Sequence, residues 1–97
     1  MTKSISLLIC LDYDDTYTRD PILWHDFIRS AKKRGHRIIC ATMRYEQEGE
    51  IVEHALAQHV EKIIYTDRKA KKPFLEELSI YPDIWIDDSP EWLLNDG

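Results

Sequence analysis

The sequence predicts an α/β domain with a parallel sheet, because short apolar runs alternate with segments of helical periodicity. Four runs rich in Ile, Val, Leu and Trp have the length and composition of buried strands. They cover residues 5–11, 37–41, 62–65 and 84–86. A helical segment separates each run from the next, and this alternation predicts parallel strands with helices on the faces of the sheet.

The first helical segment carries start and stop signals. Asp20 followed by Pro21 predicts an N-cap and a first turn, and Gly35 is placed to end the helix. Its apolar side chains recur at the spacing of one helical face and are Trp24, Phe27, Ile28 and Ala31.

Two further helices are predicted from the same periodicity. One covers roughly residues 46–59, and its inward positions are Ile51, Val52, Ala55 and Leu56. The other starts near Pro73, and its inward positions are Phe74, Leu75 and Leu78.

Length and composition set limits on what the protein does. The 97 residues fit one domain, residues 1–97, with one modest core. A formal charge of −5 argues against capture of nucleic acid or anionic membranes as the main activity. No apolar stretch approaches the length of a membrane span and no secretory signal precedes the first run, so we expect a cytoplasmic protein. Cys10 and Cys40 lie in apolar runs and are expected in the core, and the four histidines lack the spacing of a zinc site.

Polar side chains directly follow the apolar runs. Asp12 ends the first run, Thr42 the second, and the pair Asp87 and Asp88 the fourth. Ligands of open parallel sheets bind outside the carboxyl ends of the strands, where all strand-to-helix loops open. We therefore expect these side chains to converge on one edge of the sheet.

Five carboxylates crowd this edge and would repel one another unless a cation binds among them. They are Asp12, Asp14, Asp15, Asp87 and Asp88. A site of carboxylate oxygens suits Mg²⁺, which keeps several waters and takes a phosphate oxygen as a further ligand. Asp12 and Asp14 point to the same side of an extended backbone, so one can serve as nucleophile and the other as proton carrier. The alternative is a set of turn and helix-cap residues, for which Asp88 or Ser89 before Pro90 is well placed.

The chain resembles the haloacid dehalogenase superfamily over nearly its full length. The resemblance is carried by "LLICLDYDDT", "RIICATMR", "KAKKPF" and "DIWIDDSPE". An apolar strand followed by D-x-D-x-T is the first motif of that family. It implies that Asp12 becomes an aspartyl-phosphate, while Asp14 protonates the leaving group and then activates water. Aspartate at the second position is similar to the phosphatase and phosphotransferase branches.

The remaining motifs imply further roles. Thr42 would hold a phosphoryl oxygen, and Arg44, in a T-x-R pattern, would contact substrate or remain solvated. The motif lysine is Lys71 or Lys72 in preference to Lys69, and its charge would offset that of the transferring group. The final acid pair implies a Mg²⁺ site in which Asp87 joins Asp12 and the main-chain carbonyl of Asp14. Asp88 would assist as a ligand through water or orient the lysine.

The resemblance also implies a Rossmann-like three-layer sandwich with a mostly parallel four-stranded sheet in the order 3-2-1-4. The gaps between motifs are too short for a cap domain, so the site is expected to be open. The strand at residues 84–86 would then be an edge strand, and an exposed apolar edge favours a homodimer.

The expected partner is a phosphorylated substrate whose identity the sequence leaves open, with nucleic acid included only as a phosphorylated end. Two alternatives to a Mg²⁺-dependent phosphatase remain. A receiver-like signalling module has similar residues in a different order along the chain, and a non-catalytic phosphate-binding protein would keep the fold without turnover.

Overall fold

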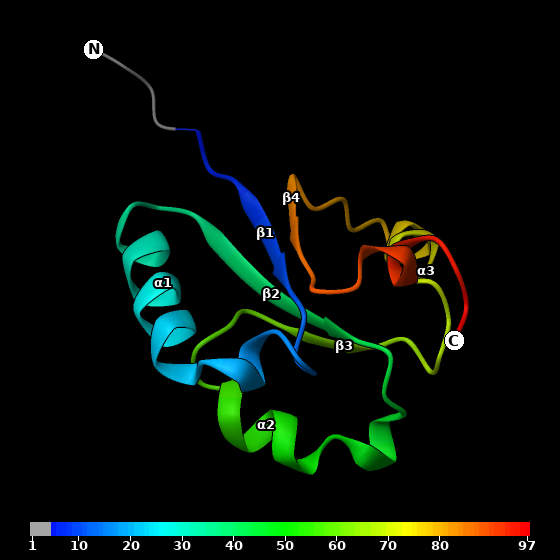
Figure 1. Cartoon of the computed structure of the whole chain (residues 1–97). Coiled ribbons are helices and arrows are strands. Elements are labelled where there is room, and N and C mark those ends of the chain that lie inside the picture. The colour runs from blue at the N-terminus through cyan, green and yellow to red at the C-terminus, as the bar shows by residue number, and fades with distance from the viewer. Residues whose placement is uncertain (1–4) are drawn as a thin grey trace.

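The computed structural model describes residues 5–97, in which four strands alternate with three α-helices (Figure 1). They are β1 (Leu8–Leu11), α1 (Pro21–Lys33), β2 (Arg37–Thr42), α2 (Glu50–Leu56), β3 (Ile63–Tyr65), α3 (Lys71–Glu77) and β4 (Ile84–Ile86). The strands form one sheet in the order β3-β2-β1-β4, and each neighbouring pair is parallel. This confirms the predicted α/β class and the strand order.

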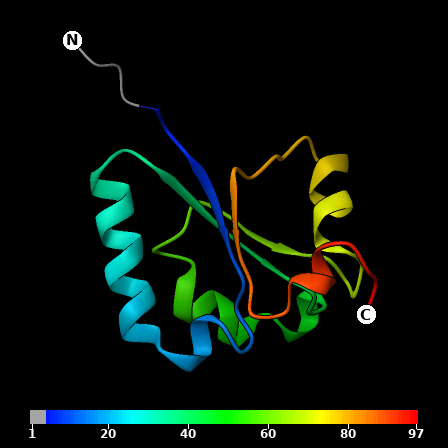
Figure 2. The same cartoon turned by 45° about the horizontal axis from the view of Figure 1, so that its top comes forward.

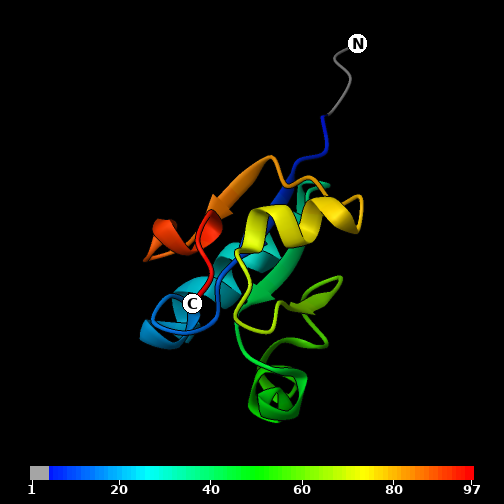
Figure 3. The same cartoon turned by 90° about the vertical axis from the view of Figure 1, so that its right-hand side faces the viewer.

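Helices cover both faces of the sheet, which gives three layers. Helices α1 and α2 lie on one face and α3 on the other (Figures 2 and 3). The alternation of side chains along a strand supplies both cores, since Ile9 and Leu11 of β1 face α1 and α2, while Cys10 faces α3. The Rossmann-like sandwich is therefore built from strands that are apolar on both faces.

Helix α1 begins and ends where its sequence signals predict. The carboxylate of Asp20 accepts a hydrogen bond from the amide of Leu23 at 3.1 Å, and Pro21 occupies the first turn. Gly35, just beyond the last turn, has a φ of +90°, a conformation that glycine adopts without strain.

The second predicted helix is broken by a glycine. A short 3-10 helix (Glu46–Glu48) comes first, and α2 starts only after Gly49. Gly49 is buried against the ring of Tyr65, where a side chain would collide with the phenol. The segment that the periodicity predicts as one helix is therefore divided at Gly49, where the backbone lies against the ring of Tyr65.

Two apolar residues that the periodicity assigns to the core lie at the surface instead. Ile51 is 57% exposed, because the short α2 turns Val52 and Leu56 toward the sheet. Leu78 is 53% exposed, because α3 starts at Lys71 rather than near Pro73 and ends at Glu77, before Leu78. Both predictions were wrong, because Ile51 lies outside the buried face of α2 and Leu78 lies beyond the last residue of α3.

The segments between strands are as short as expected, and no additional domain interrupts residues 5–97. Strand β4 forms an edge of the sheet, as predicted, and its Ile84 is exposed. Cys10 and Cys40 are free and buried, as expected. Within the described part of the chain, every helix is too short or too polar to cross a membrane.

Replacing Leu56 with alanine tests the face assigned to α2. Leu56 is fully buried, so truncation should lower the free energy of unfolding by about 2–5 kcal/mol. Ile51→Ala on the same helix is the matched control and should cost less than about 0.5 kcal/mol, because the side chain is exposed. Urea unfolding of the two variants gives both values, and equal losses would contradict the orientation of α2.

Candidate functional site

The ends of β1 and β4 bring the first and last acidic motifs together. Asp12 follows β1 and Asp87 follows β4, and the amide of Asp12 donates to the carbonyl of Ile86 at 2.9 Å. Asp88 joins them, and one carboxylate oxygen from each of the three residues lies within 4.8 Å of the others. The predicted convergence of residues some 75 positions apart in the chain is therefore present for this acidic cluster, as the register of the parallel strands requires.

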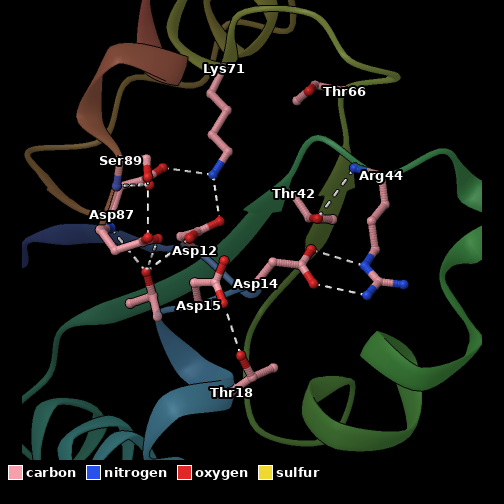
Figure 4. Close-up of polar contacts among 12 residues, drawn as sticks. Asp12, Asp14, Asp15, Thr18, Thr42, Arg44, Thr66, Lys71, Asp87 and Ser89 are labelled. Carbon is pink, nitrogen blue, oxygen red and sulfur yellow. Dashed lines mark hydrogen bonds and ion pairs between the residues drawn. The ribbon is translucent and has the colours of Figure 1, made fainter. Parts of the chain in front are cut away.

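A buried lysine links two members of the cluster. Lys71 begins α3, and its Nζ lies 2.6 Å from Oδ1 of Asp12 and 2.7 Å from Oδ2 of Asp87 (Figure 4). Its side chain is 3% exposed. Lys72 instead points to solvent and pairs with Glu76, and Lys69 is also exposed. Of the three lysines that the sequence left open, the structure places Lys71 in the site.

Burial and charge act in opposite directions on this ion pair. Burial raises the pKa of Asp12 to about 7, although Lys71 works against the shift. At Lys71 burial alone would lower the pKa, but Asp12 and Asp87 outweigh it and the pKa of the ammonium is raised. Lysine therefore stays charged, while Asp12 needs still more positive charge nearby to remain fully ionised at neutral pH.

Thr16 and Ser89 fix the outer side of the cluster. The hydroxyl of Thr16 lies 2.9 Å from both Oδ2 of Asp12 and Oδ1 of Asp88, so its one proton can go to either, and it accepts from the amide of Asp88. The amide of Ser89 donates to Asp87, and its hydroxyl donates to Asp88. Partial burial raises the pKa of the Asp88 carboxyl group, but the hydrogen bonds that it accepts lower the pKa by more. The net pKa of Asp88 is therefore below its usual value.

Asp14 faces a different partner from Asp12. Its two carboxylate oxygens accept from Nε and Nη2 of Arg44 at 3.0 and 2.8 Å (Figure 4). The guanidinium group also lies over the ring of Tyr13, 5.5 Å from its centroid. A bidentate contact of this kind holds the carboxylate plane of Asp14 and the guanidinium plane of Arg44 in a fixed relative orientation. Arg44 thus aligns Asp14 at the pocket rather than standing alone in solvent.

Thr42 ends β2 as expected but is 1% exposed. Its hydroxyl oxygen accepts a long hydrogen bond, 3.3 Å, from the amide of Arg44. Thr42 is not part of the wall of the pocket that Asp12 and Asp14 line. In this structure it supports the turn that presents Arg44.

A pocket of about 400 Å³ opens over the acidic cluster. It is lined by Asp12, Asp14, Asp15, Met43, Arg44, Arg68, Lys71, Asp87, Asp88, Ser89, Trp92 and Gly97. Five of these residues were not predicted as site residues from the sequence, namely Met43, Arg68, Ser89, Trp92 and Gly97. Position next to a recognised motif residue could have identified Met43 and Ser89, whereas nothing in the local pattern marks the other three.

Asp96 is a further residue that the sequence did not single out. Its Oδ1 accepts from the amide of Ala70 at 2.7 Å, at the N-cap position of α3, where alanine has no capping side chain of its own. The segment after the short 3-10 helix Pro90–Leu93 thus folds back and binds the residue that directly precedes α3. Because Lys71 is the next residue, this contact helps to hold the lysine over Asp12.

The residues present fit a hard divalent cation. The donors are three carboxylates that share one side of the sheet edge, and Mg²⁺ prefers oxygen ligands of this kind and retains waters for the rest of its shell. The carboxylate of Asp14 is held by Arg44 and is not part of this group of three, and the role that the resemblance implies for Asp14 is that of a ligand through its main-chain carbonyl.

Comparisons of the chain with protein-family models, with curated proteins and with solved structures found no match. A functional assignment therefore depends on the geometry and chemistry of the site.

Replacing Lys71 with methionine tests the buried ion pair. The variant leaves two buried carboxylates without their cation, so at about pH 8 it should lose about 3 kcal/mol of unfolding free energy. The loss should shrink as the pH falls. Burial keeps the pKa of Asp12 in the folded variant above that of the unfolded chain, so folding takes up a proton and acid favours the folded variant.

Urea unfolding over a pH series measures this effect, with Lys72→Met as the matched control. Lys72 is exposed, and its loss should cost less than about 0.5 kcal/mol at any pH. If the two variants lost the same unfolding free energy across the series, Lys71 would not be the residue that compensates the buried charges of Asp12 and Asp87.

Proposed function

We propose that the protein is a Mg²⁺-dependent phosphomonoester hydrolase that works as capless members of the haloacid dehalogenase superfamily do. The observation that carries the proposal is the meeting of Asp12, Lys71 and the Asp87–Asp88 pair, from three separate segments, in one pocket. A buried carboxylate next to a cation and a carboxylate cluster is what metal-assisted phosphoryl transfer needs.

In the first step a carboxylate oxygen of Asp12 attacks the phosphorus in line with the ester oxygen. The P–O bond to the leaving group breaks, and Asp14 gives that oxygen a proton. In the second step Asp14 takes a proton from water, the water oxygen attacks the phosphorus, and Asp12 is released with free phosphate. Lys71 offsets the negative charge that develops on the phosphoryl oxygens, and bound Mg²⁺ would add Lewis-acid stabilisation of the same charge.

Arg44 supports the role of Asp14 by fixing the plane of its carboxylate at the pocket. A protonated carboxyl group keeps only one strong acceptor oxygen, so Asp14 has to give up one of its two bonds to Arg44 when it holds the proton for the leaving group. Arg44 therefore positions the proton carrier, and one of these bonds has to break and form again in each turnover.

Replacement of Asp12 by asparagine tests the nucleophile. The unmodified chain should hydrolyse an aryl phosphate with Mg²⁺, lose the activity with chelator and regain it when Mg²⁺ returns. Asp12→Asn should lower kcat/KM by about 10⁴-fold or more, because the other catalytic residues contribute little once the nucleophile is missing. Asp26→Asn is the matched control, since it removes one negative charge on the exposed face of α1, outside the pocket.

If the folded, unmodified chain showed no metal-dependent hydrolysis of aryl phosphates or of a panel of phosphomonoesters, the proposal would fail. A stable acyl-phosphate on the unmodified chain, without turnover, would instead favour the receiver-like or phosphate-binding alternative.

Replacement of Asp14 by asparagine separates the two steps. With a good leaving group the first step needs little acid catalysis, but the second step still needs a base. Asp14→Asn should therefore release one equivalent of phenol quickly and then turn over about 10²–10⁴-fold more slowly. Mass spectrometry of the acid-quenched protein should find one phosphoryl group on the peptide that contains Asp12. Slow release from the first turnover, with no phosphorylated peptide, would contradict the division of labour between the two aspartates.

A further inference from the structure

Three cationic side chains line the pocket, and they differ in how completely carboxylates neutralise them. Lys71 contacts both Asp12 and Asp87, and Arg44 contacts both oxygens of Asp14. Arg68 has a single carboxylate within 4.0 Å among residues 5–97, that of Glu48, at the full 4.0 Å. Arg68 is thus the pocket cation whose donors remain available to a ligand.

The backbone around Arg68 is held in an unusual conformation. Asp67 and Arg68 have φ values of +53° and +67°, in the left-handed region that non-glycine residues rarely adopt in succession. Two backbone hydrogen bonds fix this turn, from the amide of Arg68 to the carbonyl of Met43 and from the amide of Gly97 to the carbonyl of Arg68. Since strained backbone of this kind costs about 1 kcal/mol or more per residue, its retention at a pocket wall favours a functional reason.

The side chain of Arg68 is also oriented for binding. Its guanidinium carbon lies 5.7 Å from the centroid of the Tyr45 ring, which supports one face of the group. About half of the side chain is exposed, and the group lines the same pocket as the acidic cluster. Stacking of this type restricts the guanidinium plane while it leaves the N–H edge free for a carboxylate or phosphate.

The pocket that Arg68 shares with the acidic cluster has room for more than the reacting phosphate. Its volume of about 400 Å³ is in the range of sites for small organic ligands. Trp92 and Met43 give it apolar wall, which a leaving group can contact. An inorganic phosphate at the acidic cluster would use only part of this space.

We propose that Arg68 binds a second anionic group, carried by the leaving group of the substrate. The substrate class is a small phosphomonoester that also bears a carboxylate or a second phosphate. Arg68 acts as a specificity residue, because it contacts the part of the substrate that does not react. This inference rests on the proposed function for the position of the reacting phosphate.

Non-hydrolysable phosphonates test the second site without turnover. The probes are phenylphosphonate and two derivatives with the same ring, one with a meta carboxylate and one with a meta phosphonate. Calorimetry with Mg²⁺ measures their affinities for the unmodified chain, for Arg68→Gln and for Lys69→Gln. Lys69→Gln is the matched control, because Lys69 is an exposed cation next in the chain that does not line this pocket.

The two doubly anionic probes should bind the unmodified chain and Lys69→Gln about tenfold more tightly than phenylphosphonate, since a hydrogen bond between charged groups contributes on this scale. Arg68→Gln should lose that advantage and keep its affinity for phenylphosphonate. The probe that gains more affinity over phenylphosphonate, the meta carboxylate or the meta phosphonate, identifies the second anionic group of the substrate as a carboxylate or a phosphate.

Equal affinity for all three probes, or an advantage that persists in Arg68→Gln, would overturn the inference. The five aspartates of the pocket repel any additional anion, so nonspecific attraction cannot imitate the expected result. Hydrolysis of aryl phosphates without the preference would refute the role of Arg68 alone. A preference lost in Arg68→Gln, on a chain without hydrolytic activity, would support the anion site and refute the proposed function.

Discussion

The site depends on one buried interaction, the contact of Lys71 with both Asp12 and Asp87. Each partner comes from a different element, so the interaction requires β1, β4 and α3 to be in place together. Buried charges are stable only when they are paired and hydrogen-bonded, and no described buried side-chain nitrogen or oxygen lacks a partner. The fold therefore holds Lys71, Asp12 and Asp87 in a buried position where none of these charges would be stable without the others.

The sequence predicts the architecture and the acidic cluster because both depend on local patterns. Strand and helix alternation predicts the parallel sheet, and each cluster residue directly follows an apolar run. Choosing Lys71 over Lys72 required the structure, since the two residues are adjacent and the choice depends on where α3 begins. The start of α2 also escaped prediction, because Gly49 is required by its contact with Tyr65 rather than by its neighbours in sequence.

The part of the site that the sequence could not predict comes from the last turns of the chain and from the loop after β3. Asp96 binds the amide of Ala70, just before α3, across a long separation in sequence, and Arg68 lines the pocket from a turn in which two residues have positive φ. Neither feature has a periodic or compositional signature. Arg68, together with Trp92 and Gly97 from the same C-terminal segment as Asp96, lines the pocket where we infer that the substrate's leaving group is recognised.

The most direct test of the central claim is fluorine NMR of the protein with Mg²⁺ and beryllium fluoride, which mimics a phosphoryl group on a carboxylate. If Asp12 is the nucleophile, the unmodified chain should give bound fluorine signals that require Mg²⁺ and are absent from Asp12→Asn. Bound signals of equal strength in the variant, or none in the folded, unmodified chain at saturating Mg²⁺, would contradict the account.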